Sequence, residues 1–140
     1  VQKVVHHPAM PYELIGGFTA ALRERMELSA RALEFIILTA ARTGEVIGAK
    51  WREIDLDGAI WTIPEDRTKT GVEHRVPLSH AAHSLLSKLP QIEGTQYLFP
   101  GARQGRPMSN MACLKLLERM GHDDVTVHGF RSTFRDWVRA

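Results

Sequence analysis

The chain has 140 residues, 44% of them hydrophobic and 24% charged, which is ordinary for a single globular domain with its own core. Its 18 basic and 16 acidic side chains leave a net charge of +2, too small to identify a class of partner. A single cysteine, Cys113, excludes an intrachain disulfide and indicates a reducing compartment, while the absence of an apolar run of about 20 residues argues against a membrane-spanning helix.

The first part of the chain predicts a linker and two helices. Residues 1–11 contain two prolines and are expected to form an irregular linker segment, so the domain proper spans 12–140. Apolar residues recur at helical spacing over 12–26. The apolar run within 28–41 predicts a second helix, buried on most of its sides.

A small sheet is expected in the middle of the chain. Thr43 is placed to cap a short helix that ends near Trp51. The pair Asp57-Gly58 between two apolar runs is a strong hairpin signal. The three strands are expected at 53–56, 60–63 and 74–78, and they form an antiparallel sheet.

The remainder is predicted to be helical. Ser79 is expected to cap a helix that stops at Pro90, and a long connection follows over 91–108. Ser109 is expected to cap a helix that runs through Met120. A final helix carries one apolar stripe, formed by Phe130, Phe134, Trp137 and Val138. The predicted fold class is α+β and mostly helical, with a small three-stranded antiparallel sheet.

Two residues near the end of the chain are suited to binding a phosphate. His128 and Arg131 are three residues apart near a helix start, so both side chains can point the same way. A guanidinium offers a planar pair of donors that matches phosphate oxygens. The competing interpretation is a surface arginine beside a histidine of the core, because so short a motif recurs by chance.

Two further cations and one acid support the phosphate interpretation. Arg42 follows the helix predicted to be buried and emerges at a turn, where functional side chains tend to lie. Glu45 is close enough to orient that guanidinium as a supporting acceptor. Lys69 is expected at the tip of the hairpin between the second and third strands, where a long cation can reach a ligand.

Four sequence blocks together resemble the tyrosine recombinases, and most of all the prophage and genomic-island integrases. The blocks are TAARTGEVIGAKWREIDLDG, RTKTGVEHRVPLS, YLFPG and VHGFRSTFRDW. They occur in the family's order, and the resemblance runs from about Val5 to the end of the chain. It implies the catalytic-domain fold of that family, which is mostly helical with a small antiparallel sheet.

The resemblance implies a role for each candidate residue. Arg42 matches the first catalytic arginine, Lys69 the lysine of the sheet, and His128 and Arg131 the HxxR pair. Glu45 fills the acidic position beside the first arginine. In this chemistry a tyrosine attacks a DNA phosphodiester, the two arginines stabilise the charge of the transition state, and Lys69 protonates the leaving oxygen.

The chain departs from the family pattern after HxxR. The family's second histidine or tryptophan and its nucleophilic tyrosine have no match in the family position, since Trp137 comes too soon and belongs to the apolar stripe. Tyr12 and Tyr97 are expected to be packing residues. We therefore expect a catalytic domain cut at both ends, without a nucleophile and inactive by itself.

The same resemblance implies the partners. Double-stranded DNA is the expected ligand, with further protomers assembling on it as a tetramer, whereas this chain alone is expected to be a monomer. No cofactor and no metal are expected, and the location is expected to be the bacterial cytoplasm at the nucleoid. Additional phosphate contacts are expected from Lys50, Arg67, Arg103, Arg106 and Arg135.

Two other functions remain open on the sequence alone. A regulatory DNA-binding protein would keep the phosphate-binding residues and lack catalysis. A type IB topoisomerase-like enzyme would share the chemistry, although the compact RTGE and HGFR blocks favour the integrase.

Overall fold

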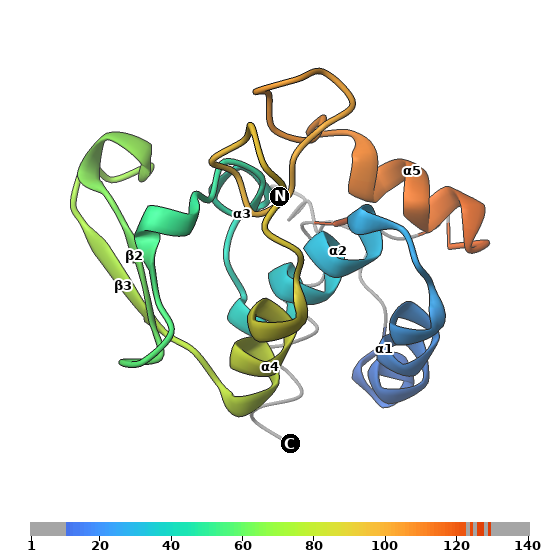
Figure 1. The fold of residues 1–140 in the computed structure, drawn as a ribbon. Helices are drawn as coiled ribbons and strands as arrows, with labels where there is room; N and C mark the ends of the chain where they lie inside the picture. Colours follow the sequence, from blue (N-terminus) through green and yellow to red (C-terminus); the bar gives the residue numbers. More distant parts are fainter. Residues whose placement is uncertain (1–10, 123, 125, 128, 130–140) are drawn as a thin grey trace, which may run out of the picture.

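The structure is a computed structural model of the chain in which residues 11–122, 124, 126, 127 and 129 are described (Figure 1). The helices among them are η1 (Tyr12–Leu14), α1 (Ile15–Glu24), α2 (Leu28–Thr39), α3 (Thr43–Ile47), η2 (Trp51–Glu53), η3 (Glu65–Arg67), α4 (His80–Lys88) and α5 (Ala112–Arg119), where η denotes a 3-10 helix. The strands are β1 (Ile54–Asp55), β2 (Ile60–Ile63) and β3 (His74–Pro77).

Helix α2 is the centre of the fold. Helices α1, α3, α4 and α5 all contact it, and the sheet lies to one side of this helical group (Figure 1). Because neighbours surround it, α2 is buried on nearly every face, as its apolar run predicted. Phe35 connects helix α2 to the sheet and to the long connection before α5. The centre of its ring lies 5.3 Å from that of Trp61 in β2 and 6.0 Å from that of Phe99.

The sheet has the predicted antiparallel order β1-β2-β3, with Trp61 opposite both Ile54 and Val76. Alternate residues of β2 point inward, so that Trp61 and Ile63 are fully buried. The predicted hairpin between β1 and β2 is present. Its turn is closed by the carboxylate of Asp55, which accepts a hydrogen bond from the Gly58 N–H over 3.0 Å.

Several boundaries differ from the prediction. Arg42, not Thr43, is the N-cap of α3, which ends at Ile47. The chain then forms η2 where the prediction began a strand, so β1 is only two residues long. Ser109 is not the cap of α5, because its hydroxyl accepts from the Met111 N–H (3.2 Å) one turn before the helix begins at Ala112.

The second half otherwise follows the sequence. Ser79 caps α4 by accepting a hydrogen bond from the Ala82 N–H over 3.2 Å. Gly121 adopts a φ of 81°, the left-handed conformation that ends a helix and favours glycine. Residues 1–10 of the predicted linker (1–11) and the residues of the predicted final helix from 130 onward lie outside the described residues. Within the part of the chain that is described, every helix is too short or too polar to cross a bilayer.

Candidate active site

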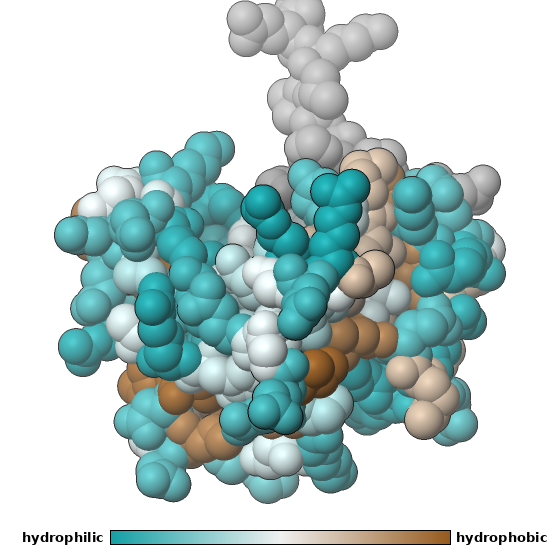
Figure 2. Space-filling view, turned by 45° about the horizontal axis from the view of Figure 1, so that its top comes forward, coloured by the Kyte–Doolittle hydropathy of each residue, from teal (hydrophilic) through white to brown (hydrophobic). Residues whose placement is uncertain are grey.

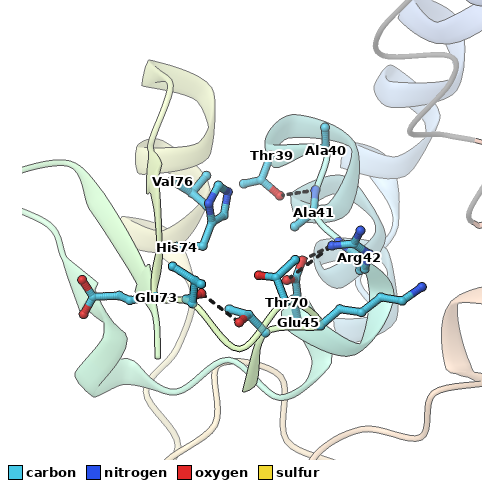
Figure 3. A pocket seen from close by; sticks show the side chains of 12 residues that line it. Thr39, Ala40, Ala41, Arg42, Glu45, Thr70, Glu73, His74 and Val76 are labelled. Carbon is cyan, nitrogen blue, oxygen red and sulfur yellow. Dashed lines mark hydrogen bonds and ion pairs between the residues drawn. The ribbon is translucent and has the colours of Figure 1, made fainter. Parts of the chain in front are cut away.

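A pocket of about 310 Å³ lies between the end of α2, the start of α3 and the hairpin of β2 and β3 (Figure 3). Arg42, Glu45 and Lys69 all line it, although 27 residues separate the two cations in the sequence. The remaining lining residues are Thr39, Ala40, Ala41, Thr68, Thr70, Val72, Glu73, His74 and Val76. The fold thus brings three of the predicted site residues to one cavity.

The end of α2 delivers Arg42 to this pocket. Ala40 ends the helix in the left-handed conformation, with a φ of 55° that costs a non-glycine residue about 1 kcal/mol. The hydroxyl of Thr39 donates to the Phe35 carbonyl (2.8 Å) and accepts from the Ala41 N–H (3.3 Å), which holds the turn. Arg42 follows immediately, with its side chain 43% exposed and available to a ligand.

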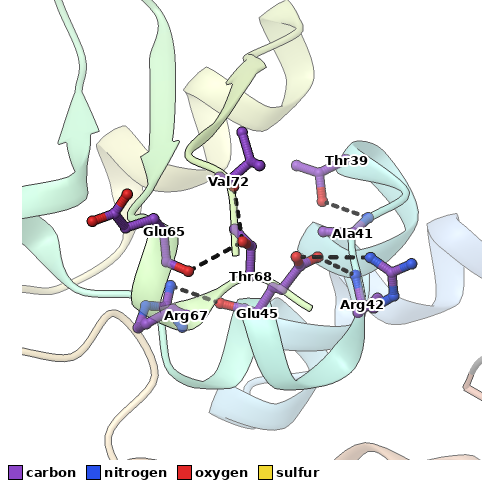
Figure 4. A network of polar contacts seen from close by, with 8 residues as sticks. All are labelled: Thr39, Ala41, Arg42, Glu45, Glu65, Arg67, Thr68 and Val72. Atoms are coloured by element: carbon purple, nitrogen blue, oxygen red, sulfur yellow. Dashed lines mark hydrogen bonds and ion pairs between the residues drawn. The ribbon is translucent and has the colours of Figure 1, made fainter. Parts of the chain in front are cut away.

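Glu45 fixes the start of α3 against Arg42 (Figure 4). Its carboxylate accepts a hydrogen bond from the Arg42 backbone N–H over 3.0 Å and lies 3.9 Å from the guanidinium. The carboxylate is buried, and it occupies the first turn of the helix, where negative charge is favoured by the helix dipole. Glu45 therefore positions the backbone of Arg42 and leaves most of the guanidinium free.

Lys69 lies on the exposed tip of the hairpin. Thr68 organises this tip, since its hydroxyl lies 2.8 Å from the Val72 carbonyl oxygen and 3.3 Å from that of Glu65. Gly71 has a φ of 73°, a turn conformation that favours glycine. The tip curls so that Lys69 and Arg42 border the same cavity.

Arg67, predicted as an additional phosphate contact, forms several contacts within the protein. Its guanidinium donates to both carboxylate oxygens of Glu53, at 2.8 and 2.6 Å, and its side chain is only 17% exposed. It also donates to the backbone carbonyl of Glu45 over 3.2 Å (Figure 4). These hydrogen bonds use the Nε and Nη2 donors of Arg67 within the protein.

Comparison with known proteins identifies the family. The model of the phage integrase family matches residues 18–138, which is most of the chain. The chain belongs to the phage integrase family. It is 36% identical over 132 residues to the prophage integrase IntZ of Escherichia coli K12, covering 92% of this chain. It is 35% identical over 153 residues to the integrase of enterobacteria phage P4, covering 95% of this chain.

The chain spans about a third of the length of those curated relatives, 33% and 35% respectively. Solved structures of an integrase and a recombinase share its fold. A lambda integrase dimer bound to a COC′ core site matches with a TM-score of 0.72 at 20% identity, over 99% of this chain and 54% of that one. The XerA recombinase matches with a TM-score of 0.73 at 19% identity, over 96% and 52%.

The other residues predicted for this integrase-family site are dispersed or undescribed. His128, Arg131 and Arg135 lie outside the described residues. Next to His128 in the sequence, Val127 is buried, and the Gly129 N–H donates to the Thr126 carbonyl over 3.1 Å. The structure therefore relates Arg42, Lys69 and Glu45 to one another and leaves the placement of the HxxR pair a prediction.

The remaining outer cations that the structure describes differ in exposure. Arg103 and Arg106 are exposed on the loop that precedes α5, at the top of Figure 1. That face comes forward in Figure 2, where hydrophilic side chains predominate and hydrophobic ones form a smaller band. Lys50 is half-buried, with its ammonium 5.8 Å from the centre of the Tyr97 ring.

The sequence interpretation missed His74 as a lining residue. It lies on β3 two residues before Val76, and both side chains face the pocket (Figure 3). The alternation of a strand places residues i and i+2 on one face, so the HRV segment contained this signal. No group of three or more histidine, cysteine or acidic side chains able to hold a metal ion occurs among the described residues.

Proposed function

We propose that the chain is the central part of the catalytic domain of a site-specific recombinase, which cleaves and rejoins double-stranded DNA through a phosphotyrosine intermediate. The observation that carries this proposal is the meeting of Arg42 and Lys69 in one pocket, with Glu45 bracing the arginine. Because the chain belongs to the phage integrase family, we propose that these two cations bind the phosphate at which DNA is cleaved.

The residues divide the chemistry between them. A tyrosine oxygen forms a bond to phosphorus while the bond from phosphorus to the 5′-oxygen breaks. Arg42 and Arg131 stabilise the charge on the non-bridging oxygens, and Lys69 gives its proton to the 5′-oxygen. His128 assists proton transfer at the nucleophile. We place the linker in 1–11 and the domain in 12–140, and we expect the tyrosine to lie outside these residues.

The proposed partners follow from the same chemistry. A lambda integrase tetramer of similar fold is bound to a Holliday junction, with a TM-score of 0.72 and 20% identity. We propose that this protein also assembles as a tetramer on two DNA duplexes, in the bacterial cytoplasm at the nucleoid. We expect the 140-residue chain alone to be monomeric and unable to cleave DNA.

A covalent adduct tests the proposal. The protein encoded by the longest natural reading frame that contains the chain is incubated with randomised DNA duplexes. Each duplex is nicked so that the cleaved end diffuses away and the covalent intermediate accumulates. We expect a denaturation-resistant protein–DNA adduct linked through tyrosine. Arg131→Ala should lower its rate of formation by about 10²–10³-fold. DNA binding without any adduct would instead favour a regulatory protein, and relaxation of supercoils without strand exchange a topoisomerase-like enzyme.

A further inference from the structure

We propose that Arg67 is a positioning residue that holds Lys69 in register with Arg42, through a clamp formed by Arg67, Glu53, Glu45 and Gly48. The inference rests on the proposed function, because it assigns Lys69 the role of proton donor to the leaving 5′-oxygen. It goes further in explaining what keeps an exposed lysine at a fixed place.

The first part of the clamp is the ion pair of Arg67 and Glu53. The two parallel hydrogen bonds, 2.8 and 2.6 Å long, fix the plane of the guanidinium as well as its position. Glu53 is itself held in the core, since its side chain is only 4% exposed and it accepts a hydrogen bond from the buried Trp61 indole over 3.1 Å. The anchor of Arg67 is therefore part of the core.

The second part of the clamp is the contact of Arg67 with helix α3. Arg67 donates to the Glu45 carbonyl over 3.2 Å, and the carboxylate of the same Glu45 holds the backbone of Arg42. Gly48 makes room for this contact, because a Cβ at that position would lie 2.6 Å from the Arg67 Nη1 atom. The φ of Gly48 is −83°, so the close approach of Arg67, not the backbone conformation, favours glycine here.

The hairpin tip has little else to hold it. Residues 69–75 are all exposed, and the tip beyond Arg67 is closed by the bonds of Thr68 and by a hydrogen bond from the Gly71 N–H to the Thr68 carbonyl of 3.4 Å. Lys69 is two residues from the clamped guanidinium. Freeing Arg67 therefore releases Lys69 from its place relative to Arg42, and misplacement by about 1 Å can cost up to about 10²-fold in rate.

A sulfur-substituted substrate separates this role from general damage. In the normal reaction the phosphorus–oxygen bond breaks and the 5′-oxygen takes the Lys69 proton. With sulfur at that bridging position the phosphorus–sulfur bond breaks and the thiolate leaves without a proton, because the pKa of a thiol is only about 8.5. A variant that lacks a well-placed proton donor is rescued by this substrate, and a variant damaged in any other way is not.

The experiment compares five proteins, each made from the natural reading frame that contains the chain: the wild type, Lys69→Ala, Arg67→Lys, Gly48→Ala and Arg119→Lys. Arg67→Lys keeps the charge and loses the two-pronged geometry. Gly48→Ala disturbs the clamp without changing any charge. Arg119→Lys is the matched control, since Arg119 also pairs with a carboxylate, that of Glu27 at 2.8 Å, on α5 and away from the pocket.

We expect Arg67→Lys and Gly48→Ala to form the adduct about 10- to 10²-fold more slowly on the oxygen substrate and near the wild-type rate on the sulfur substrate, as Lys69→Ala does. Arg119→Lys should match the wild type on both. Hydrogen exchange across 64–73 should accelerate in the two clamp variants, and the melting temperature shows whether each is folded.

The outcomes are distinct. The clamp is overturned, and the proposed function stands, in one case. In that case the wild type is active and the sulfur substrate rescues Lys69→Ala, but Arg67→Lys and Gly48→Ala either lose no activity or are not rescued by sulfur. A wild type that forms no adduct on either substrate overturns the proposed function and the clamp with it.

Discussion

The guanidinium of Arg67 donates a hydrogen bond to the backbone carbonyl of Glu45 over 3.2 Å. This contact joins the two chain segments that form the pocket, since the Glu45 carboxylate holds the Arg42 backbone and Arg67 precedes Lys69 by two residues. The segments that carry the two cations of the pocket, Arg42 and Lys69, are thus linked through Arg67 and Glu45. Such supporting contacts are what keep a catalytic arrangement within a fraction of an ångström.

The cap of α4 predicts a measurable loss of stability. Ser79→Ala removes the acceptor for the Ala82 N–H and should lower the free energy of unfolding by about 1 kcal/mol. Ser87→Ala in the same helix is the control. Its hydroxyl donates to the His83 carbonyl within the helix, so its removal should be neutral or slightly stabilising. Denaturant unfolding of both variants measures the difference, and equal effects would show that Ser79 does not cap α4.

Phe35 should contribute far more to stability, because it touches both the sheet and the segment that contains Phe99. Phe35→Ala leaves a cavity at a fully buried position and should cost about 3–5 kcal/mol. Met26→Ala, at a residue that is 96% exposed, should change stability by no more than about 0.5 kcal/mol. A small effect of Phe35→Ala in denaturant unfolding would contradict the central position of α2.

Cys113 should be inert in the folded protein. Burial raises the pKa of its thiol to about 12 from an ordinary 9.0, so the thiolate that reacts with iodoacetamide is absent at neutral pH. Because the folded pKa is raised, the stabilising contribution is fully present below pH 9 and is lost as the pH rises toward 12. Cys113→Ala should weaken the fall of stability over that window. Rapid alkylation of the native protein at pH 8 would contradict the packing of α5 on α2.

Strand cleavage should not depend on a divalent cation, since two guanidiniums and a lysine provide the positive charge that a metal provides in many phosphoryl-transfer enzymes. The protein encoded by the natural reading frame should form the covalent adduct at the same rate with and without excess EDTA. A rate that falls in EDTA and returns with added Mg²⁺ would mean that a metal takes part in the chemistry.

The sequence predicted the pattern of the fold better than its details. The apolar run of α2 and the alternation around Trp61 are strong local signals, and both elements were found where expected. The cap of α3 was misplaced by one residue, because Thr43 is a preferred capping residue while the tertiary turn at Ala40 made Arg42 the cap. Local preference loses to tertiary geometry at such positions.

The site divides in the same way. Motif order predicted Arg42 and Lys69 as site residues, and both line one pocket. The internal contacts of Arg67 could not be predicted from the sequence, since an arginine two residues from Lys69 is equally compatible with DNA contact and with an internal ion pair. The structure shows the ion pair, through a 2.6 Å contact with the buried Glu53. That partner is 14 residues away and has no sequence signal of its own.

The most direct test of the proposed active site is the single-turnover cleavage rate of Arg42→Ala. It is measured at saturating DNA, with the variant made in the full protein encoded by the natural reading frame. The side chain is 43% exposed and its ion pair with Glu45 is 3.9 Å long, so folding should be nearly unaffected. We predict a rate about 10²–10³-fold below the wild type, with an unchanged melting temperature. Equal rates for the variant and the wild type would contradict the assignment of this pocket as the site of DNA cleavage.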